Sequence, residues 1–156
     1  MGNSAFAKYR ALALGPLHRA GFLAPLLGRL AVGLLFLSTG WGKVHSLDKV
    51  TQFFVTLGIP APGLNAVVVG YSELICGALL VLGLCTRLAT LPLIASMVVA
   101  ILTAKLKDIH GIFDLVGADE FTYLCVLVML LLIGPGKASL DALLVSRVLG
   151  DSERED

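Results

Sequence analysis

The sequence predicts an all-α integral membrane four-helix bundle with a short interfacial helix after the first span. Three observations support this fold class. The 156 residues are 57% hydrophobic and only 15% charged, with a mean hydropathy of +0.91, whereas a soluble domain is typically about 45–50% apolar and about 25% charged. The apolar residues gather in four long runs, which is typical of membrane-spanning helices. Glycine and proline interrupt the chain between runs, and this predicts separate helices.

The chain is expected to begin with a basic amphipathic segment, residues 1–21, in which lysine and arginine lie among alanine and leucine. Such a segment favours the headgroup region of a membrane. The first span is predicted over residues 22–44. Pro25 falls in its opening turn, where proline is tolerated because the first backbone N–H groups of a helix have no intrahelical partner.

A short amphipathic helix is predicted over residues 47–57, between the first two spans. This segment is too short to cross a bilayer, so we expect it to lie at the membrane interface. The sequence GIPAPG at 58–63 then ends it and starts the second span, 62–84. The apolar residues of the interfacial helix recur at helical spacing: Val50, Phe53, Phe54 and Leu57.

The third and fourth spans are predicted over residues 87–106 and 120–134, which completes a transmembrane domain over 22–136. The second and third spans are joined by so few residues that they must form an antiparallel hairpin. A Gly-Pro-Gly sequence ends the fourth span. An amphipathic C-terminal tail, residues 137–156, follows, and the Ser-Leu-Asp sequence at 139–141 is expected to cap its helix.

The distribution of lysine and arginine predicts that both termini lie in the cytoplasm of a bacterial-type plasma (inner) membrane. Basic residues are enriched on the cytoplasmic side of membrane proteins. With the N-terminus inside, the inner segments carry Lys8, Arg10, Arg19, Arg87, Lys137, Arg147 and Arg154. The outer loops carry fewer: Lys43, Lys49, Lys105 and Lys107.

Several classes of function find no support in the sequence. A net charge of +1 with no basic patch gives no reason to expect nucleic acid as a partner. The histidines and cysteines have neither zinc nor haem spacing, so no metal site is expected. There is no phosphate-binding loop and no serine with a nearby histidine. The sequence therefore encodes no recognisable cofactor site and identifies no catalytic residue.

Glu73 is the one charged residue in the apolar stretch 64–84. An ionised carboxylate at membrane depth is costly, so it is expected to face the bundle interior and to pair. Arg29 lies about 10 Å from the inner end of its helix and Glu73 about 16 Å from that of its own, at ~1.5 Å per residue. We therefore predict a buried Arg29–Glu73 ion pair, with Lys43 too far away for a direct bond. The pair would either fix the helix register or line a pocket that binds a ligand or relays a proton.

The outer end of the first span carries Trp41, Lys43 and His45, close to the interfacial helix. A flat ring surface beside hydrogen-bond donors suits the head group of a quinone, which becomes the candidate ligand. The alternative is ordinary interfacial anchoring, for which tryptophan is common. Later residues expected to reach the same outer mouth are His110, Asp114, Glu120 and Tyr123.

The chain resembles the DoxX family of small four-helix membrane proteins over about residues 28–141. The resemblance rests on ordered motifs: RLAVGLLF at 29–36, GWGK at 40–43, the Phe53–Phe54 pair, GIPAP at 58–62, ELICGALLVLGLCTR at 73–87, GPG at 134–136 and SLD at 139–141. It implies the four-helix fold and a membrane location. It also implies one of three roles: a subunit linked to quinone-dependent oxidation, a membrane anchor of oxidative-stress complexes, or an assembly chaperone.

The leading hypothesis is a quinone-associated or redox-accessory subunit of a membrane complex. In this reading the chain is at most a subunit of a quinone-linked oxidoreductase. The alternative hypothesis is a non-catalytic membrane anchor or assembly factor for partner proteins. Both hypotheses place the chain in a lipid bilayer with protein partners, and either is compatible with a homo-oligomer.

Overall fold

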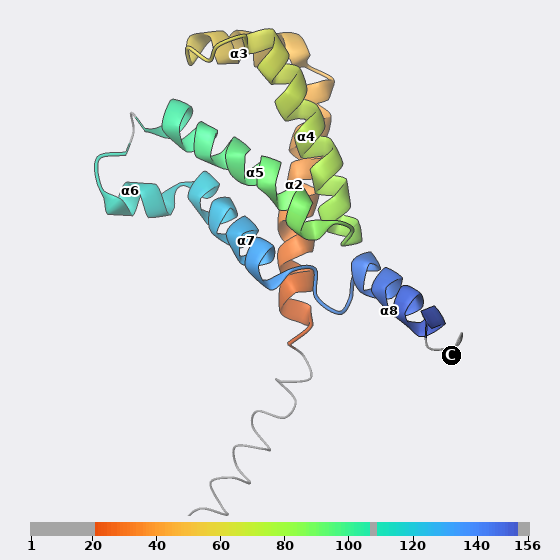
Figure 1. Cartoon of the computed structure of the whole chain (residues 1–156). Coiled ribbons are helices and arrows are strands. Elements are labelled where there is room, and N and C mark those ends of the chain that lie inside the picture. The colour runs from red at the N-terminus through yellow and green to blue at the C-terminus, as the bar shows by residue number, and fades with distance from the viewer. Residues whose placement is uncertain (1–20, 107–108, 153–156) are drawn as a thin grey trace, which may run out of the picture.

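The computed structural model describes residues 21–106 and 109–152, with side chains described as far as residue 147. All regular structure in these ranges is helical (Figure 1), which confirms the predicted all-α class. The predicted basic segment 1–21 lies outside the described residues except for its last residue. Residues 153–156 of the predicted C-terminal tail also lie outside them.

The helices and their bounds can be followed along the chain in Figure 1. The short helix α6 is not among the predicted elements, and the π-helical segment η1 forms the end of the predicted third span. The order is α2 (Leu23–Val44), α3 (Leu47–Thr56), α4 (Pro62–Leu82), α5 (Thr86–Ala100), η1 (Ile101–Lys105), α6 (Ile112–Gly117), α7 (Asp119–Ile133) and α8 (Leu140–Ser152).

Three helical stretches are long and apolar enough to cross a membrane: Leu23–Val44, Pro62–Leu82 and Thr86–Lys105, the last combining α5 and η1. The helix α7 has 15 residues. At ~1.5 Å per residue it is about 22 Å long, against about 30 Å for the hydrocarbon core of a bilayer. The described residues therefore provide three candidate spans and several shorter helices, and the fourth span stays a prediction.

The two longest helices, α2 and α4, lie side by side in antiparallel directions (Figure 1). Glycines let their backbones meet. A Cβ atom on Gly77 would lie 2.9 Å from the backbone of Phe36, and one on Gly33 would lie 3.0 Å from the backbone nitrogen of Val81. Membrane helices associate through such close packing, because their surfaces are already out of water and the hydrophobic effect does not drive them together.

The glycine contacts also fix the register of the two helices. Because of this register, α2 begins about two turns beyond the C-terminal end of α4. At the other end, α4 begins about two turns beyond the C-terminal end of α2, where it packs against α3. Three facing pairs define the register: Gly33 with Val81, Gly40 with Leu74, and Gly70 with Val44.

The hydrophobic core is shared by α2, α4, α5 and α7. Most of the other large apolar side chains are exposed, as expected where a helix faces lipid. Figure 1 shows α5 and α7 alongside each other, inclined to the α2–α4 pair. The core residues are Val32, Phe36, Cys76, Leu80, Ala89, Leu93, Met97, Leu127 and Leu130.

The start of α8 is held at the turn between α4 and α5. The carboxylate of Asp141 accepts hydrogen bonds from the backbone nitrogens of Cys85 (2.9 Å) and Thr86 (3.3 Å). It therefore caps α5 rather than its own helix. The cap of α8 is Ser139, whose Oγ accepts a hydrogen bond from the backbone nitrogen of Ala142 at 3.1 Å.

Replacing Gly40 by alanine should destabilise the protein, because the new Cβ would overlap the backbone of Leu74. Overpacking of this kind costs about 1–3 kcal/mol. Gly42→Ala is a matched control two residues along the same helix, since nothing lies within 4 Å of its Cβ position. Its stability should be unchanged or slightly higher, because alanine favours the helix. Thermal unfolding in detergent measures both, and equal effects would contradict the close contact.

Candidate functional site

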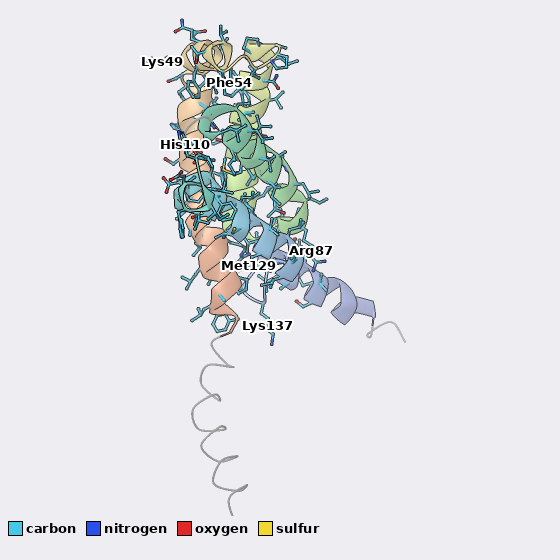
Figure 2. The ribbon with its side chains drawn as sticks, turned by 90° about the vertical axis from the view of Figure 1, so that its left-hand side faces the viewer. Lys49, Phe54, Arg87, His110, Met129 and Lys137 are labelled. Atoms are coloured by element: carbon cyan, nitrogen blue, oxygen red, sulfur yellow. The ribbon has the colours of Figure 1, made fainter. Side chains whose placement is uncertain are left out.

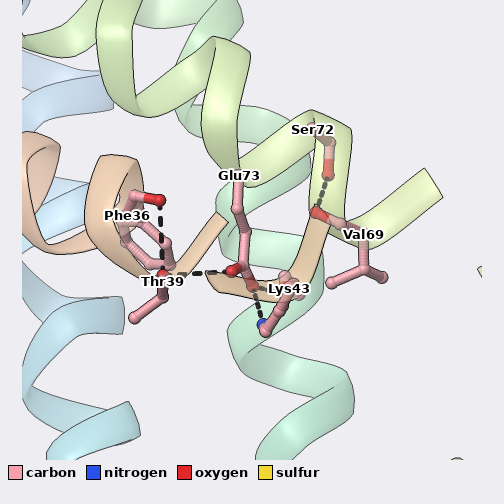
Figure 3. A network of polar contacts seen from close by, with 7 residues as sticks. Phe36, Thr39, Lys43, Val69, Ser72 and Glu73 are labelled. Atoms are coloured by element: carbon pink, nitrogen blue, oxygen red, sulfur yellow. Dashed lines mark hydrogen bonds and ion pairs between the residues drawn. The ribbon is translucent and has the colours of Figure 1, made fainter. Parts of the chain in front are cut away.

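Glu73 is buried in α4 with 1% of its surface exposed. Its Oε1 accepts hydrogen bonds from Lys43 Nζ at 2.6 Å and from Ser96 Oγ at 3.0 Å. Its Oε2 accepts one from Thr39 Oγ1 at 3.1 Å (Figure 3). These donors come from α2 and α5, so a single carboxylate joins three helices by hydrogen bonds.

The predicted Arg29–Glu73 ion pair is wrong. Glu73 forms its ion pair with Lys43, and Arg29 Nη2 donates instead to the carbonyl of Ala138 at 2.5 Å. The depth estimate assumed that the inner ends of the two helices are level, whereas the glycine register staggers them. Arg29 therefore lies beside Gly83, ten residues from Glu73, or about 15 Å at ~1.5 Å per residue.

Arg29 is nevertheless fully buried, at 1% exposed. Its guanidinium packs against Gly83 and Ser139, close to where α8 begins. Two of its nitrogens, Nε and Nη1, have no hydrogen-bond partner among the described residues. Arg29 therefore belongs to the contact between α2 and the C-terminal segment, at the opposite end of the bundle from α3.

A cavity of about 570 Å³ adjoins the Lys43–Glu73 pair, between α3, α4, α5 and η1. We call the end of the cavity formed by Lys43, Glu73 and Ser96 its floor. Most of the remaining lining is apolar, and α3 contributes the aromatic part. The apolar lining residues are Val50, Phe53, Phe54, Leu57, Ile59, Val68, Val69, Pro92, Ala95, Met97, Val99, Ala100 and Ala104, and the other polar ones are Lys49, Asn65 and Ser72.

The cavity has lipid-facing apolar residues at its edge. Phe53, Val68 and Val99 line it and yet are 53%, 54% and 47% exposed. In a membrane such side chains contact hydrocarbon, so an apolar molecule could enter from the bilayer. The floor lies deep, since Glu73 is 11 residues into α4 from Pro62, or about 16 Å at ~1.5 Å per residue.

The two ends of the molecule differ in which residues they carry. Figure 2 shows Lys49 and Phe54 together at the α3 end, and Arg87 and Lys137 toward the other end. The cavity therefore extends from the α3 end of the molecule to about the middle of α4. That distance corresponds to roughly one leaflet of a bilayer whose core is about 30 Å thick.

The other predicted ligand-binding residues do not line the cavity. Trp41 is 60% exposed and its ring stacks on that of His45, with centroids 4.2 Å apart. Tyr123 packs edge-on against Phe36 in the core, with centroids 6.5 Å apart. His110 is exposed, and its backbone nitrogen donates to Asp114 at 2.9 Å. Of the seven residues predicted for the outer mouth, which also include Asp114 and Glu120, only Lys43 lines the cavity.

Ser96 and Thr39 are the site residues that the sequence reasoning misses. Ser96 lies in an otherwise apolar run, and Thr39 lies in the first span between its charged residues Arg29 and Lys43. Serine and threonine are common in membrane helices because their hydroxyls bond to backbone carbonyls of their own helix. Ser72 does this, since its Oγ donates to the carbonyl of Val69 at 3.0 Å. Only the packing of α5 against α4 shows that Ser96 serves Glu73 instead.

At the floor, the ammonium group of Lys43 lines the cavity while it is paired with Glu73. The Lys43 side chain is 30% exposed, and an ammonium group has three donors, of which one is used on Glu73. The two remaining donors suit a hydrogen-bond acceptor such as a carbonyl oxygen. Residues 21–106 and 109–152 hold no group of three or more histidine, cysteine or acidic residues arranged to bind a metal ion.

Comparison with known proteins gives a family and several relatives. The DoxX family model matches residues 24–106. The membrane protein Rv3486 of Mycobacterium tuberculosis, described as uncharacterized, is 37% identical over 84% of this chain and 87% of its own. "Putative oxidoreductase CatD" of Bacillus subtilis is 33% identical over 67% of this chain and 73% of its own. "Inner membrane protein YphA" of Escherichia coli is 32% identical over 74% and 86%. No solved structure matches the chain.

Removing one partner of the Lys43–Glu73 pair should leave an unpaired charge inside the membrane. Glu73→Gln and Lys43→Met should each lower the free energy of unfolding, by up to about 3–5 kcal/mol. The double variant should lose clearly less than the sum, because the two side chains interact directly. Unfolding in detergent measures the cycle.

Arg29→Gln provides the control for this cycle. Combined with Glu73→Gln, its effect should be additive within about 0.5 kcal/mol, because the two residues share no partner. Strong coupling of Glu73 to Arg29 and none to Lys43 would restore the pairing that the sequence predicts.

Proposed function

This chain belongs to the DoxX family, and on that premise we propose that it is a quinone-associated, redox-accessory subunit of a membrane complex. It is an integral membrane protein, and two of its relatives are described as membrane proteins. The observation that carries the proposal is the cavity beside α3, which combines an apolar lining with one deep polar end. A quinone has the same two parts, a ring with carbonyl oxygens and an apolar tail.

The size and the position of the cavity support a lipophilic ligand. A volume of about 570 Å³ falls within the range of roughly 300–1,000 Å³ typical of small-molecule sites. Such sites are mostly apolar with a few well-placed polar groups. Phe53 and Phe54 supply aromatic surface in the lining, and the exposed edge lets an isoprenoid tail extend into the bilayer. The ring would then enter first and reach the floor.

The chemistry of the floor supports a carbonyl group over other polar groups. Lys43 has donors to spare, whereas the Glu73 oxygens already accept three hydrogen bonds. A carbonyl oxygen accepts without bringing charge. Ser72 and Ser96 add hydroxyl groups to the same lining, so the reduced, hydroxyl form of a quinone also finds partners there.

The redox centre in this proposal belongs to a partner protein. The role of the chain is to hold the quinone beside that partner, at a fixed depth in the membrane. One relative is named "Putative oxidoreductase CatD" in Bacillus subtilis, and that name supports a redox setting for this chain. The membrane-anchor and assembly roles are what remain if the cavity binds no quinone.

We also propose that α7 is the fourth span and that both termini are cytoplasmic. The helix α7 runs beside α5 and returns the chain to the start of α2 (Figure 1). There Met129 meets Gly28, and Pro25 meets Gly136. A short span is accommodated by local thinning of the bilayer. The segments at this end of the bundle, where α2 begins and α7 ends, carry more lysine and arginine than the segments at the α3 end. This difference favours the cytoplasmic side for them.

Blocking the cavity should abolish quinone binding. Ala95→Trp places a large side chain at a lining position and should weaken binding of a decyl-substituted benzoquinone at least about tenfold, since pocket complementarity dominates such affinities. Ala31→Trp is the matched control, an exposed alanine on α2 outside the lining. Fluorescence titration of purified protein in nanodiscs measures both.

Trp41→Ala separates the cavity from the outer site that the sequence predicts. Binding should be unchanged, because Trp41 does not line the cavity. Loss of binding in Trp41→Ala together with normal binding in Ala95→Trp would move the ligand to the outer face of α2. Absence of binding in the folded wild-type protein would leave the anchor or assembly role.

Reporter fusions test the topology. Green fluorescent protein fused after Asp156 should fluoresce, because four spans return the C-terminus to the cytoplasm. Alkaline phosphatase fused after Ile59 should be active, because the α3–α4 turn would lie outside. A dark C-terminal fusion with an active phosphatase after Ile59 would mean that α7 does not cross.

A further inference from the structure

We propose that Glu73 is a specificity-determining residue which, by neutralising Lys43, keeps anionic amphiphiles out of the cavity. The inference rests on the proposed function in that it concerns the same cavity and the same class of lipophilic ligand. It goes further by naming which amphiphiles the cavity rejects and which residue rejects them. The class accepted is neutral amphiphiles with a carbonyl group, and the class rejected is fatty acids and other lipids with an anionic head.

A cavity that opens to the bilayer is surrounded by abundant anionic amphiphiles. An ammonium group at the end of an apolar cavity would attract any carboxylate or phosphate attached to an acyl chain, because charges interact strongly where the dielectric constant is low. Lys43 would act in this way if it stood alone. The cavity is open along apolar, lipid-facing residues, so such molecules reach it freely.

The geometry of the floor removes this attraction. Glu73 Oε1 lies 2.6 Å from Lys43 Nζ, so the positive charge is already compensated. A second carboxylate at Lys43 would lie next to that of Glu73, and like charges in a site of low dielectric repel strongly. A ketone, quinone or ester carbonyl avoids this repulsion and still uses the spare donors of Lys43.

Two further contacts keep the Glu73 carboxylate in place. Ser96 Oγ and Thr39 Oγ1 hold it from α5 and α2. An incoming anion therefore cannot displace the carboxylate by turning it aside, because that would break three hydrogen bonds in a buried position. Specificity often depends on such a repulsive element as much as on attraction.

Lys49 does not alter this reasoning. It is the remaining charged residue of the lining, is exposed, and belongs to α3 at the far end of the cavity from the floor. Figure 2 places it at the α3 end of the molecule, and an interfacial helix such as α3 is expected to lie among lipid head groups. An anionic head held there stays at the surface and does not occupy the floor.

The test compares laurate with methyl laurate, which has the same acyl chain but is an uncharged methyl ester, at a pH where laurate is ionised. Each competes with a fluorescent fatty-acyl reporter for purified protein in nanodiscs. The wild-type protein should prefer the ester by at least about tenfold, because an anion at the floor meets the Glu73 charge. Equal affinities in the wild type, or no binding of either ligand, would overturn the inference without any variant being needed.

Variants then identify the residue responsible. Glu73→Gln keeps the size of the side chain and should raise laurate affinity at least about tenfold, because Lys43 becomes an unpaired cation. In the Lys43→Gln/Glu73→Gln double variant this gain should disappear. A folded Glu73→Gln protein without any gain would refute the assignment.

A second charge test covers the case in which Glu73→Gln is too unstable to purify. Lys43→Gln leaves the carboxylate at the floor, and it should favour dodecylamine over laurate relative to the wild type. No change in this ratio would contradict the inference.

The ester preference of the wild type is independent of quinone binding. If the ester binds but the decyl benzoquinone does not, the proposed function fails while the role of Glu73 stands.

Discussion

The ion pair between Lys43 and Glu73 constrains the packing of α2, α4 and α5. A carboxylate in the middle of a membrane helix has no water to solvate it, so it requires a cation and further donors from neighbouring helices. Here Lys43 and Thr39 come from α2 and Ser96 from α5. These contacts tie the three candidate spans together at one depth. They also place a polar group at the end of an otherwise apolar cavity.

The second buried charge, Arg29, serves the opposite end of the molecule. It joins α2 to the carbonyl of Ala138, next to the point where Asp141 caps α5. The C-terminal segment is thereby fixed to the turn between α4 and α5. The two charges are about 15 Å apart along the bundle at ~1.5 Å per residue, so Arg29 organises one end of the bundle and Glu73 its middle.

Membrane packing explains why the cavity exists beside α3. The close contact of α2 with α4 depends on glycines, and these lie along the part of α4 that faces α2. Beyond the end of α2, α4 meets α3 instead, and the large side chains Phe53 and Phe54 line the space there. Pro92 also lines the cavity. Proline lacks the backbone N–H that an ordinary helical residue would donate to the preceding turn. The cavity therefore lies where α4 packs against α3 and α5.

The sequence by itself determined the helical fold class, the membrane location, and the need of Glu73 for a partner. These follow from composition, periodicity and the cost of a charge in lipid, all of which are local properties. It did not determine which cation meets Glu73. That choice depends on how far α2 slides along α4. With the inner ends of the two helices level, Arg29 would be the nearer cation, whereas the observed offset of about two turns brings Lys43 to Glu73. Only the tertiary structure decided the register, because backbone contacts at Gly33, Gly40 and Gly77 set it. Ser96 and the cavity depend likewise on how α5 and α3 pack against α4, which no spacing within one helix encodes.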